Sequence, residues 1–220
     1  MIKDVTSRDD KMMHSILEFI KTLHSTQGLE HLIATGGLLV LIGIVFAETG
    51  LLAGFFFPGD SLLVTAGYLA SRGLLNIYTL NVVLMLAAIC GDQCGFLLGK
   101  KTGPKIFDKP DNRFFKKKYV LEAHQFYEKH GGKAIVLARF APILRTFVPF
   151  IAGVAQMQYR HYAPFSVMGG VFWILSMTLL GYSLGHSPLG EKIHFVVMAV
   201  VAISILPMLL GLLKRFFKKN

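Results

Sequence analysis

Long apolar runs, broken by glycine, proline and isolated charges, dominate the chain. The first run, residues 32–57, is almost wholly apolar and contains a single charge, Glu48. Helix-breaking residues interrupt it at Glu48-Thr49-Gly50 and again at Pro58-Gly59-Asp60. This pattern favours two helical arms joined by a break over one tilted helix. We call residues 32–60 the acidic hairpin.

A second broken run, residues 134–158, carries Arg139 and Arg145 in a segment of otherwise membrane character. The residues that interrupt it are Pro142, Pro149 and Gly153. An arginine near the centre of a bilayer costs at least ~2.5 kcal/mol, so it normally faces a cavity, a partner or a ligand. Broken backbone at that depth is tolerated only where protein or water satisfies its polar groups. We therefore predict a re-entrant arginine hairpin that lines a polar pocket.

The two hairpins resemble copies of one unit. An offset of 91 positions places Glu48 on Arg139 and Pro58 on Pro149. The halves are thus predicted to be repeats that carry opposite charge.

Further apolar helices follow each hairpin. Residues 61–70 predict a helix that Asp60 or Ser61 caps and Arg72-Gly73 ends. Residues 76–100 predict a membrane span with small residues at intervals of four, which allow close helix packing: Gly91, Gly95, Gly99 and Gly103. Asp92 lies beside this stripe, and we interpret it as a structural hydrogen-bonding residue. Residues 165–185 and 193–213 predict the last two spans.

Amphipathic and basic segments complete the pattern. Residues 1–27 and 115–130 each contain an apolar stripe at helical spacing, which predicts interfacial helices. Residues 28–213 are predicted to form a single membrane domain, followed by a basic tail, residues 214–220. A further basic segment, residues 100–118, is predicted to be a loop between spans.

Composition supports a membrane protein over a soluble one. Of the 220 residues 53% are hydrophobic and 16% are charged, with a formal net charge of +10. The basic excess lies next to membrane segments, so it indicates a cytoplasmic loop and a cytoplasmic C-terminus and not a nucleic-acid partner. Cys90 and Cys94 fit neither a zinc site nor a disulfide framework, and we expect them only to pack.

Counting crossings from the cytoplasmic C-terminus predicts that the two hairpins open to opposite sides. The chain is then all-α and polytopic, with two opposed re-entrant hairpins in an inverted repeat, as in transporters. This count places the N-terminus outside. If the N-terminus lies inside, residues 32–57 contain a full crossing and the argument for inverted halves is weaker.

The four charges in the hairpins suggest how such a protein works. Arg139 and Arg145 present planar forks of donors that suit a phosphate, so we assign them to substrate binding. Glu48 and Asp60 are expected to pair with the arginines and to exchange partners or take up a proton when an anion enters. In the competing interpretation these charges are ion pairs that only pin the hairpins together.

Two other classes of function compete with anion transport: an enzyme of phosphoryl chemistry and a cation or drug antiporter. We find no nucleophile or cluster of metal ligands suited to phosphoryl chemistry, so we expect no enzyme, metal or cofactor. A proton-coupled antiporter for cations or drugs stays open, because carboxylates suit it, although two arginines favour an anionic substrate.

Several motifs in order resemble the DedA family of bacterial inner-membrane proteins, over about residues 28–185. They are Glu48-Thr49-Gly50, Phe57-Pro58-Gly59-Asp60, Gly91-Asp92 with Gly95 and Gly99, Arg139-Phe140-Ala141-Pro142, Arg145-Thr146, Pro149, Ala152-Gly153 and Trp173. The resemblance implies two opposed re-entrant hairpins and transport of undecaprenyl phosphate from the outer to the inner leaflet. It also implies a link to proton-motive force and envelope maintenance, with Glu48, Asp60, Arg139 and Arg145 as the required charged residues.

Overall fold

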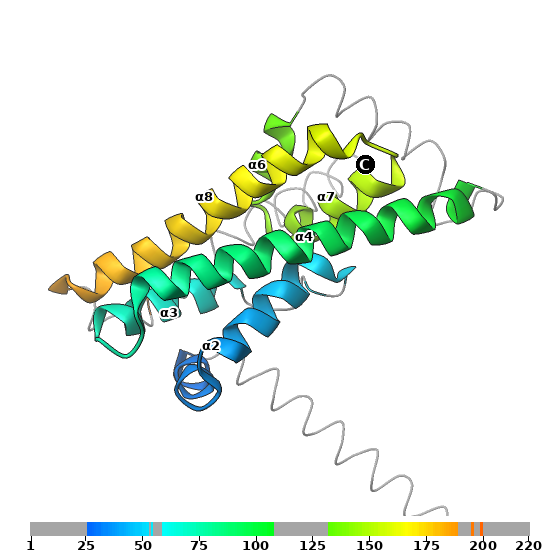
Figure 1. Cartoon of the computed structure of the whole chain (residues 1–220). Helices are drawn as coiled ribbons and strands as arrows, with labels where there is room; N and C mark the ends of the chain where they lie inside the picture. Colours follow the sequence, from blue (N-terminus) through cyan, green and yellow to red (C-terminus); the bar gives the residue numbers. More distant parts are fainter. Residues whose placement is uncertain are drawn as a thin grey trace, which may run out of the picture.

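Two long apolar helices, α4 (Ile77–Phe107) and α8 (Tyr159–Gly185), extend along the computed structural model (Figure 1). The structure describes residues 26–52, 54, 59–107, 132–188, 195 and 199, and within them every regular element is helical. Ile77–Gly103 and Tyr159–Gly185 each contain 27 residues and are apolar enough to cross a membrane. At 1.5 Å per residue each is about 40 Å long, against a hydrocarbon core of about 30 Å. The predicted all-α class is confirmed for this part of the chain.

The same order of elements occurs twice. In the first half α2 (Thr26–Gly50) is followed by a break, by α3 (Gly59–Ser71) and by α4. In the second half α6 (Lys133–Ala138) is followed by a break, by α7 (Pro142–Val154) and by α8. The short helices α3 and α7 each contain 13 residues. Each predicted hairpin therefore corresponds to two successive α-helices, the first pair ending and beginning at Gly50 and Gly59 and the second at Ala138 and Pro142.

Some predicted features lie wholly or almost wholly outside the described residues. They are the amphipathic segments 1–27 and 115–130, most of the basic loop 100–118, Pro58, the span 193–213 and the tail 214–220.

The break in the second half follows from Pro142. A proline disfavours helical backbone in the residue before it, and Ala141 is extended, with φ −112° and ψ 113°. Pro142 then begins α7, where its missing N–H costs no hydrogen bond. The prediction that Pro149 and Gly153 also break the hairpin is wrong, because α7 continues through both to Val154.

The sequence offset of 91 does not hold for every pair of corresponding helices. It relates Glu48, near the end of α2, to Arg139, next to the end of α6. The second arms begin at Gly59 and Pro142, which are only 83 positions apart. The offset changes because the first break is longer than the second.

Local signals set the turn between α3 and α4. Gly73 has φ 81°, and the N–H groups of Gly73 and Leu74 donate to the carbonyls of Ala70 and Leu69, an arrangement that closes a helix at a glycine. The Asn76 side chain accepts hydrogen bonds from the N–H groups of Tyr78 and Thr79 at 2.9 and 3.1 Å and caps α4. The predicted end of α3 is confirmed. Its predicted start is wrong by one or two residues, because α3 begins at Gly59 and includes Asp60 and Ser61 in its first turn.

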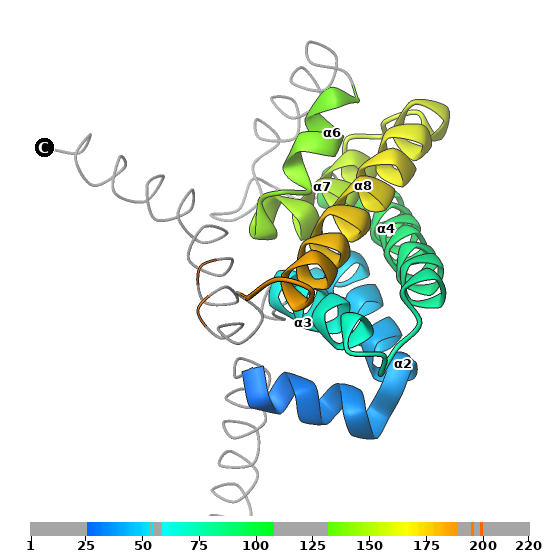
Figure 2. The same cartoon turned by 90° about the vertical axis from the view of Figure 1, so that its left-hand side faces the viewer.

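A bend within α2 was not predicted. Gly37 has φ 56° and ψ −150°, a conformation that glycine adopts far more easily than other residues. Figure 2 shows the first part of α2 turned sharply away from the part that ends at Gly50.

Each short helix packs against the long helix of the other half. α3 lies along α8, where Gly67 faces the Thr178 carbonyl and Gly181 faces the Val64 carbonyl. α7 lies along α4, where Gly99 faces the Phe150 carbonyl. Small residues at these positions let the backbones approach closely.

The predicted glycine stripe of α4 is confirmed as a packing surface. A Cβ atom added at Gly95 would lie 3.3 Å from Pro149, and one at Gly103 would lie 3.0 Å from the Val154 carbonyl oxygen. Gly91 faces Thr49 and Gly50 of α2. Gly153 belongs to the same contact, because its missing side chain would meet the backbone of α4 at Phe96 and Lys100.

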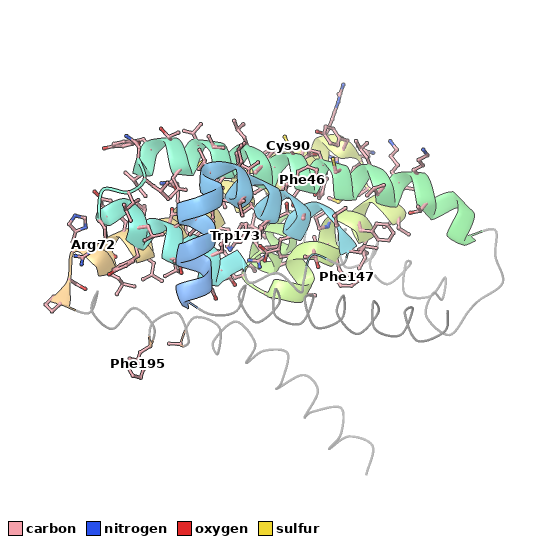
Figure 3. All side chains as sticks on the ribbon, turned by 90° about the horizontal axis from the view of Figure 1, so that it is seen from below. Phe46, Arg72, Cys90, Phe147, Trp173 and Phe195 are labelled. Carbon is pink, nitrogen blue, oxygen red and sulfur yellow. The ribbon has the colours of Figure 1, made fainter. Side chains whose placement is uncertain are left out.

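The cysteines differ from expectation. Cys90 and Cys94 are free, and Cys90 is exposed on α4 instead of packing inside (Figure 3).

Replacing Gly99 by alanine should destabilise the fold. The new methyl group would overlap the Phe150 carbonyl, and overpacking of this kind typically costs about 1–3 kcal/mol. Unfolding of the purified protein in detergent measures the change. Gly43→Ala is the matched control, because nothing lies within 4 Å of a Cβ atom there. Equal stability of the two variants would contradict the close packing of α4 on α7.

Candidate functional site

Arg145 lies in the first turns of α7 and is held by two carboxylates from the other half of the chain. Its Nη1 donates to Asp60 Oδ1 at 2.6 Å, and its Nη2 forms an ion pair with Glu48 Oε1. Glu48 belongs to the last turn of α2 and Asp60 to the first turn of α3. All three side chains are buried. A single guanidinium thus joins both arms of the acidic hairpin to the arginine hairpin.

Trp173 completes this group from α8. Its indole N–H donates to Asp60 Oδ1 at 2.8 Å, and the Arg145 Cζ atom lies 4.2 Å from the centre of its ring. Figure 3 shows Trp173 among the helices. The ring face attracts the cation while the ring edge orients the carboxylate. We call Glu48, Asp60, Arg145 and Trp173 the Arg145 centre.

Gly59 makes room for the Glu48 carboxylate. A Cβ atom at Gly59 would overlap both carboxylate oxygens of Glu48. This residue was predicted as a helix breaker, and it does stand where the break ends. Its lack of a side chain also allows Glu48 to reach Arg145.

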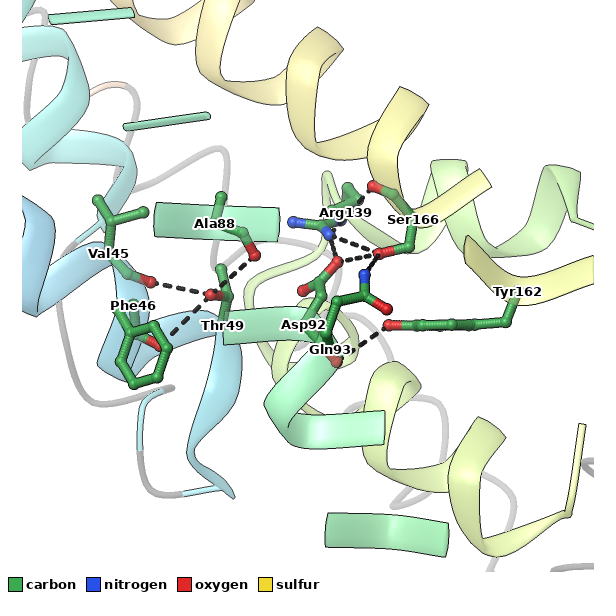
Figure 4. Close-up of polar contacts among 9 residues, drawn as sticks. All are labelled: Val45, Phe46, Thr49, Ala88, Asp92, Gln93, Arg139, Tyr162 and Ser166. Carbon is green, nitrogen blue, oxygen red and sulfur yellow. Dashed lines mark hydrogen bonds and ion pairs between the residues drawn. The ribbon is translucent and has the colours of Figure 1, made fainter. Parts of the chain in front are cut away.

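Arg139 lies in the break between α6 and α7 and has a different partner (Figure 4). Its Nη2 forms an ion pair with Asp92 Oδ2 of α4 and donates to the Ser166 carbonyl oxygen of α8 at 3.3 Å. The Ser166 hydroxyl donates to the same Asp92 oxygen. We call Asp92, Arg139 and Ser166 the Arg139 centre.

Neighbouring polar groups fix the positions of these residues. The Tyr162 hydroxyl donates to the Asp92 carbonyl oxygen at 3.3 Å, and the Gln93 amide donates to Ser166 Oγ at 3.5 Å. One turn earlier on α4 the Thr49 hydroxyl lies 3.3 Å from the Ala88 carbonyl oxygen, which ties α2 to α4 (Figure 4).

The two centres contain more acid than base. Glu48, Asp60 and Asp92 face Arg139 and Arg145, and each of these five side chains is less than a tenth exposed. If all were ionised, the group would carry one net negative charge. Burying an unbalanced charge between apolar helices is costly, so ionisation of all three carboxylates at once is disfavoured.

The expected pairing is confirmed in part. Glu48 and Asp60 pair with an arginine as predicted, but both select Arg145. Asp92, predicted to be a structural hydrogen-bonding residue beside the glycine stripe, accepts a hydrogen bond from Ser166, but its ion pair with Arg139 was not predicted. The signal was present, because an acid inside an apolar span normally has a charged partner.

Trp173 and Ser166 were also missed as members of the site. Trp173 is the single tryptophan of the chain, and it stands in a family motif, but no spacing rule connects residue 173 to residues 60 and 145. Within the part of the chain that the structure describes, no three His, Cys, Asp or Glu side chains are grouped as metal ligands would be.

Comparisons with known proteins agree on one family. Residues 57–183 match the VTT domain family. Protein DedA of Escherichia coli (strain K12) is 41% identical over 210 residues, which cover 93% of this chain and 95% of that protein. An uncharacterized membrane protein of Mycobacterium tuberculosis is 46% identical over 171 residues, 76% of this chain and 75% of that protein. Inner membrane protein YqjA of Escherichia coli (strain K12) is 35% identical over 153 residues, 70% of each chain. No solved structure matches.

Trp173→Phe should keep an aromatic face for Arg145 and remove the donor to Asp60. A hydrogen bond to a charged group contributes about 1.5–3 kcal/mol, and we expect the free energy of unfolding to fall by that amount. Met168→Leu on the same helix is the control, because Met168 is 52% exposed. Chemical unfolding in detergent compares the two, and an unchanged value for Trp173→Phe would show that the indole N–H contributes nothing.

Proposed function

This chain belongs to the DedA family of membrane proteins, and on that premise we propose that it carries a lipid phosphate across the bacterial plasma membrane. We take the substrate to be undecaprenyl phosphate, moved from the outer to the inner leaflet in support of the cell envelope. The proposed protein is multi-pass in the inner membrane with a cytoplasmic C-terminus. The process breaks no covalent bond, so we place the protein among carriers and not enzymes, without a cofactor.

The observation that carries this proposal is the burial of Arg139 and Arg145, each 2% exposed, between apolar helices. Arginine keeps its charge and offers several donors in one plane, which suits the oxygens of a phosphate. A lipid phosphate has a long apolar tail that can stay in the bilayer. A carrier needs to shelter only the headgroup, and a chain of 220 residues is large enough for that task.

Proton coupling is proposed from the balance of charges. Three buried carboxylates face two arginines, so an arriving phosphate competes with acids that already occupy the guanidinium groups. A carboxylate that loses its arginine in an apolar environment is stabilised by taking up a proton. Substrate entry and proton uptake would then occur together, which allows the proton-motive force to drive transport.

We further propose that the two halves form an inverted repeat with opposed re-entrant hairpins. The repeated order of elements supports this arrangement, as does the reciprocal packing of α3 on α8 and of α7 on α4. In transporters of this kind broken helices from the two repeats meet near the middle of the membrane. The contacts of the Arg145 centre, which join α2, α3, α7 and α8, support this proposal.

The excess of carboxylates favours a second candidate, a proton-coupled antiporter for cations or drugs. A cation would neutralise the extra negative charge directly. The two candidates differ in which substrate needs the arginines, so assays with lipid phosphate and with cations separate them.

Arg145→Lys should reduce leaflet exchange of undecaprenyl phosphate in proteoliposomes about tenfold or more. Lysine keeps the charge, but it cannot present two nitrogens in a fixed plane to a phosphate or to two carboxylates. Arg160→Lys is the control, because Arg160 is exposed at the start of α8. If the wild type exchanges the lipid no faster than empty liposomes while folded, the carrier proposal fails and the cation antiporter takes its place.

Glu48→Gln should abolish the response of exchange to an imposed proton gradient. The protein should remain folded, because Arg145 keeps its ion pair with Asp60 at 2.6 Å. Exchange is measured with and without the gradient, and Glu30→Gln near the start of α2 is the control for loss of one carboxylate elsewhere. A gradient response equal to that of the wild type in Glu48→Gln would remove Glu48 from the coupling mechanism.

A further inference from the structure

The two buried arginines differ in how their terminal nitrogens are occupied. Arg145 uses Nη1 for Asp60, Nη2 for Glu48 and its flat face for Trp173, and only its Nε has no hydrogen-bond partner among the described residues. Arg139 uses Nη2 for Asp92 and Ser166, whereas its buried Nη1 has no hydrogen-bond partner among the described residues. Arg139 therefore has donor capacity left for an anion.

Two glycines of α8 lie against the Arg139 side chain. A Cβ atom at Gly169 would lie 3.1 Å from Arg139 Cγ, and one at Gly170 would lie 3.6 Å from both Nη1 and Nη2. A side chain larger than alanine at Gly170 would crowd the guanidinium. Glycine thus places no competing group beside Nη1.

The Asp92 carboxylate occupies the place that an anionic ligand would take. Its Oδ2 binds Arg139 Nη2 and the Ser166 hydroxyl, while its buried Oδ1 has no partner in the described part of the chain. Ser166 Oγ already lies within reach of two donors, Arg139 Nη2 and the Gln93 amide, both at 3.5 Å. The hydroxyl proton is thus directed toward the anion, whichever anion is present.

We infer that Asp92 is an internal substitute for the substrate phosphate. It neutralises Arg139 when the site holds no ligand, and a monoester phosphate displaces it to bind Arg139 Nη1, Arg139 Nη2 and the Ser166 hydroxyl. This inference rests on the proposed lipid-phosphate carrier, and it adds Asp92 and Ser166 as residues that set affinity for the phosphate. A purely structural Asp92 would stabilise the fold without competing with any ligand.

The two roles predict opposite results for Asp92→Asn. Removal of a competing carboxylate should make phosphatidic acid bind at least about tenfold tighter than in the wild type, because a charged hydrogen bond no longer has to be broken. Binding is measured from the rise in thermal unfolding midpoint of the detergent-purified protein with increasing phosphatidic acid. Adding Ser166→Ala to Asp92→Asn should remove most of the gain, since the donor to the phosphate is lost.

Thr178→Val is the control. It also removes a buried side-chain hydrogen bond, the one from the Thr178 hydroxyl to Asn81 Oδ1 at 2.6 Å, but it touches neither centre, so no tighter binding is expected. An equal gain in both variants would overturn the assignment to Asp92, and so would unchanged or weaker binding in Asp92→Asn when the wild type binds. If the wild type binds no phosphatidic acid, the lipid-phosphate proposal fails first and takes this inference with it.

Two other ligands are tested in place of phosphatidic acid: phosphatidylglycerol and inorganic phosphate. If inorganic phosphate stabilises Asp92→Asn as well as phosphatidic acid does, the site is supported but its ligand is the free anion. Asp92→Asn is also purified with phosphatidylcholine as a neutral lipid. If the variant is unstable there, the yield of monodisperse protein with phosphatidylcholine is compared with the yield with phosphatidic acid. Rescue by phosphatidic acid alone supports the inference, and equal losses in both lipids overturn it.

Discussion

The ion pairs of two arginines, buried between apolar helices, are the interaction on which the rest of this structure depends. Removing one partner of a buried ion pair typically costs about 3–5 kcal/mol, so each guanidinium requires an acid at a fixed place. Arg145 draws α2 and α3 together through Glu48 and Asp60, and Arg139 draws in α4 through Asp92. The glycines at the helix crossings follow from this requirement, because charged groups on short tethers meet only when backbones lie close.

The Arg145 centre and the Arg139 centre also divide the work of the site. In the first, two carboxylates share one cation that an aromatic ring covers, which makes a closely held group. In the second, one carboxylate faces a cation that retains an unused terminal nitrogen, Arg139 Nη1. On the proposed function the first centre would keep its geometry while the second exchanges its contacts.

The sequence alone predicts the helices and identifies the charged residues of the site, but it does not predict which of these residues pair. Hydrophobic runs, Pro142 and Gly73 are local signals, and they located the ends of α3 to within two residues and the break before α7. Pairing is a long-range property: Arg145 meets Glu48 across 97 positions, and a repeat with unequal breaks misaligned the second arms. Pro149 was predicted to break the hairpin, whereas it lies within α7. Asp92 was placed in packing because the glycine stripe beside it is the stronger pattern.

The reciprocal packing of α3 with α8 and of α7 with α4 has a consequence for biogenesis. When α3 emerges from the ribosome, more than 100 residues must still be synthesised before the part of α8 that packs against Gly67 exists. Glu48 and Asp60 must therefore enter the membrane before the arginine that neutralises them exists. Contacts of such high sequence separation form late. Until the second half arrives these carboxylates lack the arginine that they have in the folded protein, and binding a proton lowers the cost of burying them.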